Sequence, residues 1–335
     1  MDSLLGTGTA SNGLMLRVAF LTSIALLASC GVDFGTSGDF LCEGCNAKKS
    51  EPILLVHGFS VDASVWDDVI DTMEAEGFLV FAPELPSFES IDARARDLGQ
   101  AIDDALLVAE YSGLSTTGKV HLVGYSMGGL DSRYAISTLG YGDRVASLTT
   151  IGTPHRGSAI ADFFLGLSDT VTGSYTTEQI VNSASAYFGV IDISDEKTRR
   201  ALLDLSTSKA VDFNKKNPDD ARVNYESWAG LSNPFGFVRK ADAEECDRGD
   251  KPLTSVRHNM PYAKVPLAYL TGGVLEQAAS DGVVTVPSAT WGNFRGCLLG
   301  THETLAESSN LFDAVNFYRE LARSLTDPAP ELVRD

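Results

Sequence analysis

The pentapeptide Gly124-Tyr125-Ser126-Met127-Gly128 constrains this chain more than any other feature, and it directly follows the apolar run 120–123. A serine displayed on a sharp strand-to-helix turn crowds the backbone, so the residues two before and two after it must lack a bulky side chain. Such a turn exposes a hydroxyl that is otherwise a weak nucleophile. An ordinary glycine-rich turn is the structural alternative, but the preceding strand and a helix predicted over 127–139 favour a catalytic Ser126.

Continuous apolar runs alternate with amphipathic stretches along the chain, as they do when helices cover both faces of a parallel sheet. Strands are predicted over 53–56, 78–82, 120–123, 145–151, 223–228 and 265–270. Helices are predicted over 65–76, 91–109, 127–139 and 305–325. The alternation predicts a doubly wound α/β fold with a mostly parallel sheet, in one catalytic domain over residues 51–335.

The rhythm of strands and helices breaks down over residues 158–223, which carry helical fragments. In the first fragment, Ile160, Phe163, Phe164 and Leu167 make an apolar face. An insertion of this kind beside a catalytic site is expected to form a helical lid, or cap, and an ordinary packed insertion is the alternative.

Residues 1–30 are predicted to be the signal peptide of a lipoprotein. Arg17 precedes the apolar stretch 18–28, which is too short to span a bilayer. The stretch ends in Leu27-Ala28-Ser29-Cys30, which resembles the lipobox in which a bacterial lipoprotein is lipidated on cysteine. We expect export and anchoring to an outer membrane or cell surface through Cys30, followed by a flexible tether over 31–50. A plain secretory signal is the alternative, and Met15 is a candidate initiator.

The formal net charge of −19 argues against a nucleic-acid partner, because phosphates would be repelled by such a surface. With Cys30 set aside, four cysteines remain, and an even number in an exported protein suggests disulfides. Three pairings are possible. The preferred one joins Cys246 to Cys297 and leaves a local link between Cys42 and Cys45.

A serine nucleophile needs a base and an acidic group that orients the base. In enzymes with this type of turn, the acid and then the base follow the serine along the chain. His302 stands in a loop before the last predicted helix, where it can reach the nucleophile, and it is favoured over His258. Asp281, in a Ser-Asp-Gly-Val-Val sequence, is the preferred acid. Its rivals are Asp247, Asp250 and Glu276.

The oxyanion that develops during acyl transfer needs two fixed hydrogen-bond donors. The backbone N–H of Met127, after the nucleophile, and that of Phe59, in the loop after the first strand, are the candidates. The imidazole of His57 is predicted to brace that loop, and His121 is predicted to be structural. His155 is a candidate for the wall of the site.

Together these motifs resemble the pseudomonad-type bacterial triacylglycerol lipases, over about residues 52–325. The matching segments are 52–59, 123–129, 151–158, 227–230, 281–284 and His302. The segment Gly152-Thr153-Pro154-His155-Arg156-Gly157-Ser158 is the most specific of them. The resemblance implies an α/β-hydrolase fold, a mobile helical lid over an acyl groove, and Ser126, Asp281 and His302 as the catalytic triad. It also implies an oxyanion hole at Phe59 and Met127.

Two departures from that family concern metal and disulfide sites. Those lipases carry a calcium-binding aspartate two residues after the catalytic histidine, where this chain has Thr304. Their disulfide partner after the catalytic aspartate is also missing, near Pro287. We therefore predict no cofactor and no metal site, although other carboxylates could build a different calcium site. The dependence of those lipases on a foldase does not transfer to this chain.

The sequence predicts a serine carboxylic ester hydrolase, in the first place a lipase that cleaves acylglycerol esters through an acyl-enzyme. A short-chain esterase or an aliphatic polyester depolymerase of the polyhydroxyalkanoate type would share the triad and differ in the groove and the lid. A surface lipoprotein that binds without catalysis is the alternative from another class.

Overall fold

The computed structural model describes residues 50–114, 117–166, 185, 191–232, 244–246, 279–308 and 312–326. Within them lies a six-stranded sheet of order β2-β1-β3-β4-β5-β6, in which all neighbouring strands are parallel. The strands are β1 Ile53–Val56, β2 Val80–Phe81, β3 Val120–Tyr125, β4 Val145–Ile151, β5 Asn224–Leu231 and β6 Asn293–Leu299. The predicted α/β fold is confirmed.

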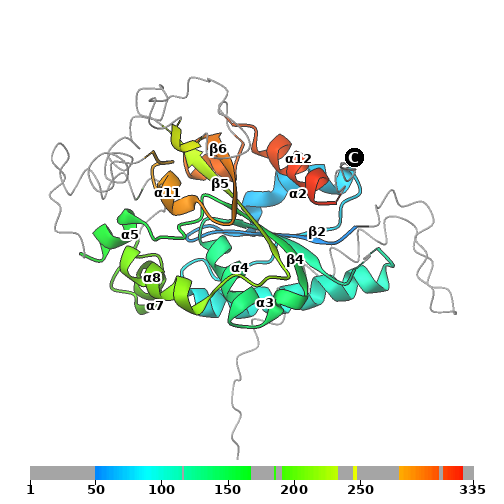
Figure 1. Ribbon diagram of the computed structural model, residues 1–335, viewed down its shortest axis with the longest axis horizontal. Helices are drawn as coiled ribbons and strands as arrows, with labels where there is room; N and C mark the ends of the chain where they lie inside the picture. The colour runs from blue at the N-terminus through cyan, green and yellow to red at the C-terminus, as the bar shows by residue number, and fades with distance from the viewer. Residues whose placement is uncertain are drawn as a thin grey trace, which may run out of the picture.

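Helices cover both faces of the sheet (Figure 1). On one face lie α2 (Asp67–Ala75) and α12 (Ala314–Thr326), and on the other lie α3 (Ile91–Tyr111) and α4 (Met127–Ser137). Strand β3 is buried along its whole length, and its alternate side chains enter two different cores. Val123 and Tyr125 join the core under α2 and α12, whereas Val120 and Leu122 join the core under α3 and α4. This double burial explains why apolar residues on both faces dominate β3, with His121 as its polar exception.

The ends of several elements differ from the predictions. The helix predicted from 65 is preceded by a 3₁₀ turn, η1 (Ala63–Trp66), because the carboxylate of Asp62 accepts a hydrogen bond from the Ser64 N–H. The predicted start of the helix over 305–325 is wrong. A 3₁₀ turn, η5 (Glu303–Leu305), comes first, and α12 begins at Ala314. The strand predicted over 265–270 lies outside the described residues.

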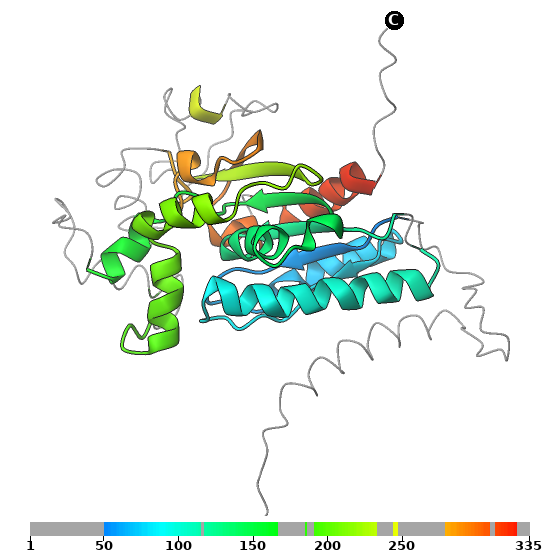
Figure 2. The ribbon, with the colours of Figure 1, turned by 60° about the horizontal axis from the view of Figure 1, so that its bottom comes forward.

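Between β4 and β5 the structure describes three helices of the predicted insertion: α5 (Ala159–Phe164), α7 (Glu196–Asp204) and α8 (Thr207–Lys216). They lie together at one end of the sheet (Figure 2). The carboxylate of Asp204 accepts a hydrogen bond from the Ile91 N–H, at the start of α3, and Asp162 accepts one from the Thr207 hydroxyl. These contacts fasten α7 to α3 and α5 to α8. The role of the insertion as a lid stays a prediction.

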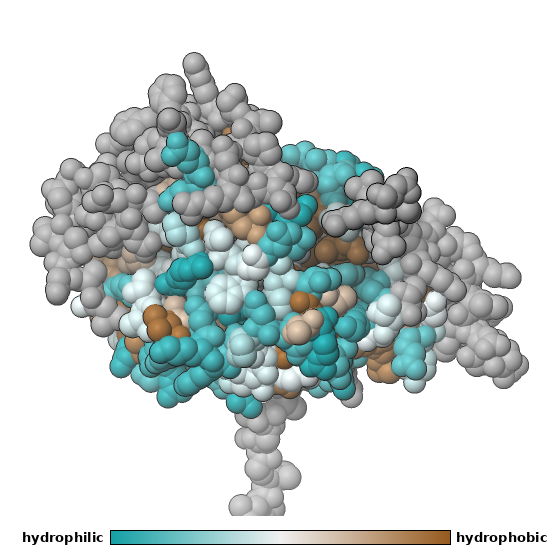
Figure 3. Space-filling view, viewed as in Figure 1, coloured by the Kyte–Doolittle hydropathy of each residue, from teal (hydrophilic) through white to brown (hydrophobic). Residues whose placement is uncertain are grey.

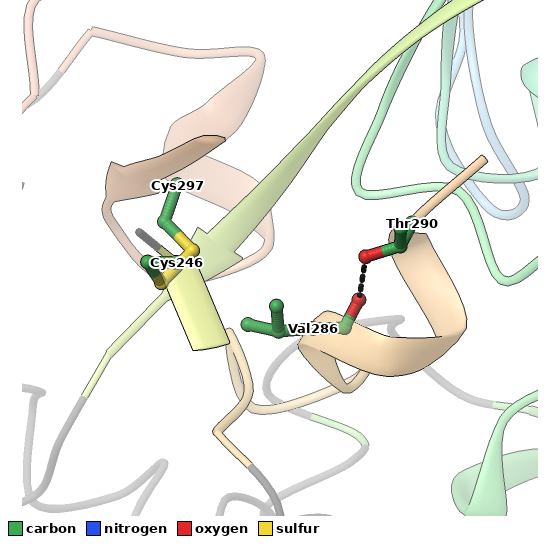
Figure 4. Close-up of a disulfide and its surroundings, with 4 residues drawn as sticks. All are labelled: Cys246, Val286, Thr290 and Cys297. Carbon is green, nitrogen blue, oxygen red and sulfur yellow. Dashed lines mark hydrogen bonds between the residues drawn. A yellow bond between two sulfur atoms is a disulfide. The ribbon is translucent and has the colours of Figure 1, made fainter. Parts of the chain in front are cut away.

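The disulfide preferred from the sequence is confirmed between Cys246 and Cys297 (Figure 4). It joins a helical turn at 244–246 to β6, close to α11 (Val286–Ala289), whose last turn is closed by a hydrogen bond from the Thr290 hydroxyl to the Val286 carbonyl. The second predicted pair, Cys42 and Cys45, lies outside the described residues.

The face of the molecule in Figure 3 is mainly hydrophilic, with small and separate apolar areas. Among the residues described, none of the helices combines the length and the apolar character needed to cross a membrane.

Candidate active site

Ser126 lies between β3 and α4, in a backbone conformation that few non-glycine residues adopt. Its φ of 52° places it at positive φ, and its N–H donates to the Ile151 carbonyl of the neighbouring strand at 2.9 Å. The turn is tight on both sides. A Cβ on Gly128 would come within 2.2 Å of the Val56 carbonyl oxygen, and one on Gly124 within 2.6 Å of Gly129. The glycines of the pentapeptide are therefore required by close backbone packing.

The side chains of Ser126, His302 and Asp281 form a continuous line of hydrogen bonds. The Ser126 Oγ lies 2.8 Å from His302 Nε2, and His302 Nδ1 lies 2.7 Å from Asp281 Oδ2. His302 is 3% exposed and Asp281 is fully buried, whereas Ser126 is partly exposed. The structure thus brings together the three residues that the sequence proposed, from segments up to 176 residues apart.

A tight turn presents the Asp281 carboxylate to the imidazole. Its Oδ1 accepts hydrogen bonds from the N–H groups of Val283 and Val284, at 2.9 and 2.8 Å, which leaves Oδ2 facing His302. Gly282, at φ 100°, allows this turn. The backbone of the turn also holds the loop of His302, because the His302 N–H donates to the Asp281 carbonyl at 3.0 Å.

The space for this pair exists because a glycine lies at the end of each of two neighbouring strands, Gly230 as the last residue but one of β5 and Gly152 directly after β4. A Cβ on Gly230 of β5 would lie 2.6 Å from the Cβ of Asp281. A Cβ on Gly152, just after β4, would lie 3.3 Å from both Asp281 Oδ2 and His302 Cε1. Gly152 also has a φ of 60°, where other residues are strained.

The loop after β1 lies against Ser126. A Cβ on Gly58 would lie 2.7 Å from the Ser126 Cβ and 3.3 Å from its Oγ, so the chain passes as close as a glycine allows. Phe59 follows, is 6% exposed, and packs edge-on against Phe88 at 5.2 Å. Met127, the first residue of α4, lies where the N–H groups of a helix carry partial positive charge. Phe59 therefore follows the residue that touches Ser126, and Met127 follows Ser126 itself, while their role as oxyanion donors stays a prediction.

His57 braces this loop, as the sequence predicted. It is fully buried, and its Nε2 accepts a hydrogen bond from the Leu85 N–H at 2.9 Å. An imidazole that accepts at Nε2 is neutral. Burial, together with the nearby Arg94 guanidinium, lowers the pKa of His57 to about 4, which keeps the ring neutral near pH 7.

Sequence reasoning missed Arg94 and Asp131, a fully buried ion pair between α3 and α4 at 2.8 Å. The guanidinium of Arg94 also donates to the carbonyls of His57, at 2.7 Å, and Pro86, at 2.8 Å. It therefore fixes the loop that leads to Phe59. Burial raises the pKa of the Asp131 carboxyl, and Arg94 opposes that effect. The available signal was Arg94 itself, a charged residue on the apolar face of a predicted helix.

The other histidines near the sheet are structural. His121 Nδ1 lies 2.7 Å from the Ser147 Oγ, which agrees with its predicted structural role. His155 does not line the site: it is fully buried, stacks on Trp291, and bonds to Thr150. The rival base His258 and the rival acids lie outside the described residues, at Asp247, Asp250 and Glu276.

In the part of the chain that the structure describes, no three His, Cys, Asp or Glu side chains gather as a metal site would require. At the position where the resembling lipases place a calcium-binding aspartate, Thr304 donates its hydroxyl to the Thr301 carbonyl at 3.0 Å. This position therefore offers no carboxylate to a calcium ion.

A sequence model of a protein family, described as the alpha/beta hydrolase family, matches residues 53–289. A triacylglycerol lipase of Burkholderia plantarii is 30% identical over 249 residues, which cover 70% of this chain and 63% of that relative. A triacylglycerol lipase of Pseudarthrobacter phenanthrenivorans is 32% identical over 218 residues, covering 60% of this chain and 61% of that relative. The chain thus spans about three fifths of the length of either relative.

Among solved structures, the mature form of a Bacillus licheniformis lipase superposes with a TM-score of 0.56. The match covers 82% of this chain and 92% of that chain, at 18% identity. A match at this identity concerns the fold alone.

Proposed function

This chain belongs to the alpha/beta hydrolase family, and on that premise we propose that it is a serine hydrolase of carboxylic esters. The observation that carries the proposal is the line of hydrogen bonds from Ser126 through His302 to Asp281, on a strained turn that exposes the hydroxyl. Nucleophile, base and orienting carboxylate stand in the order that acyl transfer requires.

In the proposed reaction, His302 Nε2 takes the proton from the Ser126 Oγ as the oxygen attacks the ester carbonyl carbon. The N–H groups of Phe59 and Met127 would stabilise the resulting oxyanion. The protonated imidazole then gives its proton to the leaving alcohol, which leaves an acyl-enzyme on Ser126. Water, deprotonated by His302, attacks the acyl carbonyl carbon, and the imidazolium returns that proton to the Ser126 Oγ as the acid leaves. Throughout, Asp281 stabilises the imidazolium and fixes its tautomer without taking the proton.

Acylglycerols are the proposed substrates. Two observations support this choice: the relatives described above are triacylglycerol lipases, and the oxyanion residues adjoin an apolar cluster that also receives side chains from α5 and α7. In this cluster Phe59 and Met127 pack with Ala161 and Leu202. If the ester carbonyl oxygen is held at the oxyanion donors, the acyl chain attached to that carbonyl would lie close to apolar side chains.

The test is hydrolysis of p-nitrophenyl esters from acetyl to palmitoyl, and of emulsified triglyceride, by the wild type and by Ser126→Ala. We expect turnover that depends on Ser126 and increases toward long chains and emulsions. Activity confined to short soluble esters would make the protein an esterase and would direct attention to polyesters. No serine-dependent turnover on any substrate would favour a protein that binds without catalysis.

Ser126→Ala is expected to lower kcat by at least about 10³-fold, the range of triad deletions.

Asp281→Asn should lower kcat by about 10⁴-fold. The turn N–H groups would retain the amide oxygen of the asparagine and direct its NH₂ group at His302 Nδ1, and this favours the wrong tautomer of the imidazole. Steady-state kinetics with p-nitrophenyl butyrate measures both. A fully active Asp281→Asn variant would contradict the assignment of the acid.

The lipid anchor at Cys30 is a separate proposal, which rests on the tetrapeptide 27–30 and the tether behind it. A diacylated cysteine would hold the enzyme at a membrane surface, since two acyl chains bind far more firmly than one. Membrane fractions of cells that express the wild type or Cys30→Ser should differ, with the variant in the soluble fraction. The same distribution for both proteins would exclude the anchor.

A further inference from the structure

The hydroxyl of Tyr125 donates a hydrogen bond to the backbone carbonyl of His302, at 2.9 Å. Tyr125 is the last residue of β3 and directly precedes Ser126, while His302 lies 177 residues further along the chain. The bond is buried, and Tyr125 is 5% exposed. It connects the strand that carries the nucleophile to the loop that carries the base.

Both polar backbone atoms of His302 are bound by segments that carry the other two members of the hydrogen-bonded line. Its N–H donates to the Asp281 carbonyl at 3.0 Å, and its carbonyl accepts from Tyr125. The same carbonyl accepts a longer bond, of 3.2 Å, from the Leu305 N–H within the η5 turn. Tyr125 therefore supplies the tie between the His302 backbone and the β3 end of the site.

The ring of Tyr125 is itself held on the face of the sheet under α2 and α12. It packs edge-on against Trp66, with centroids 6.2 Å apart, and Trp66 is fully buried. The ring centroid also lies 5.1 Å from that of the His302 imidazole. A rigid aromatic side chain of this kind places its hydroxyl at a fixed point.

We propose that Tyr125 is a positioning residue for the base, which acts by holding the His302 backbone so that Nε2 stays aligned with the Ser126 Oγ. The proposal rests on the proposed function, in which His302 takes the serine proton. The tyrosine transfers no proton and touches no substrate; it limits the movement of the loop. Loss of alignment is costly, since a misplacement of about 1 Å can lower a rate about 10²-fold.

The test compares Tyr125→Phe with Tyr318→Phe. Tyr318 is a matched control: its buried hydroxyl donates to the Leu305 carbonyl at 2.8 Å, and its ring packs edge-on against Trp66 at 5.0 Å. Both changes remove one buried hydroxyl and keep the ring, so both should lower thermal stability to a similar extent. Only Tyr125→Phe should lower kcat, by roughly tenfold or more, with KM close to that of the wild type.

Rescue separates the hydrogen bond from the packing of the ring. With 4-aminophenylalanine at position 125, a para N–H donor remains, and we expect most of the lost kcat to return. With 4-methoxyphenylalanine, which has no donor, kcat should stay low. An unchanged kcat in Tyr125→Phe, equal losses in the Tyr318→Phe control, or equal activity of the two rescue variants would each overturn the proposal.

A proton NMR measurement does not depend on turnover. In the wild type, the His302 Nδ1 proton that faces Asp281 should give a low-field signal, which should broaden or move upfield in Tyr125→Phe and persist in Tyr318→Phe. If the wild type shows this signal but hydrolyses no ester, the proposed function fails while the positioning role is still decided. An identical signal in all three proteins would refute the positioning role.

Discussion

At the scale of single residues, the site depends on glycines, because a side chain at their positions would collide with the site. Gly58 leaves room for the hydroxyl-bearing Cβ of Ser126, and Gly152 and Gly230 leave room for the side chains of His302 and Asp281. Each of these glycines comes from a different loop or strand end, so no single motif contains them. The Ser126–His302–Asp281 line therefore needs these close approaches as well as its polar groups.

Gly58→Ala is predicted to lower kcat about 10²-fold, because its new Cβ would come within 2.7 Å of the Ser126 Cβ and displace the nucleophile. The matched control is Gly113→Ala at the end of α3, where a Cβ meets nothing within 4 Å. The control has a φ of 65°, so it should lose about 1 kcal/mol of stability and keep its kcat. Kinetics and urea unfolding of both variants test this, and an active Gly58→Ala would contradict the close packing.

At the scale of elements, the sequence predicted the parts whose constraints are local. The β3–α4 turn was predictable because its glycine spacing and its buried strand lie within ten neighbouring residues. Strand β6 was missed, since Arg295 and Gly296 interrupt its apolar pattern, and its pairing with β5 compensates. The Arg94–Asp131 pair was also missed, because the partner of a buried charge on another helix is invisible until both helices are placed.

The disulfide between Cys246 and Cys297 holds β6 in place by a covalent bond, in addition to its pairing with β5. Replacing both Cys246 and Cys297 by alanine opens a link across 51 residues, which is expected to cost about 4 kcal/mol if chain entropy dominates. Because His302 is held separately by Asp281 and Tyr125, kcat should change little. Urea unfolding and steady-state kinetics measure the two effects. Dithiothreitol should reproduce the loss in the wild type, and a stability unaffected by the double change would contradict this role.

At the scale of the whole molecule, three buried histidines make the stability of the fold depend on pH. Burial lowers the pKa values of His57, His121 and His155 below their usual range, so the folded state keeps all three neutral. When the pH falls below about 6.5, these histidines bind protons in the unfolded chain but stay unprotonated in the folded state. Each of these three histidines therefore contributes a decrease in the free energy of unfolding as the pH falls toward 4, whereas the raised pKa of Asp131 acts in the opposite direction.

His57 allows this effect to be measured at one residue. Its pKa moves from 6.5 to about 4, so it should account for about 3 kcal/mol of the stability lost between pH 6.5 and pH 4. His57→Gln keeps an acceptor for the Leu85 N–H but has no proton to bind. Urea unfolding of both proteins at pH 7, 5.5 and 4 should show the wild type losing its advantage with acid. Parallel curves for the two proteins would exclude His57 as a source of acid sensitivity.

The strand order has a consequence for how the site comes into being. The nucleophile turn is complete once α4 has formed, but the base follows β6, the edge strand that pairs only with β5 in the described sheet. A chain that has assembled β1 to β5 holds a serine with nothing to remove its proton. On the proposed mechanism, hydrolysis should return during refolding only when the final strand has docked, and a growing or truncated chain should be inactive toward esters.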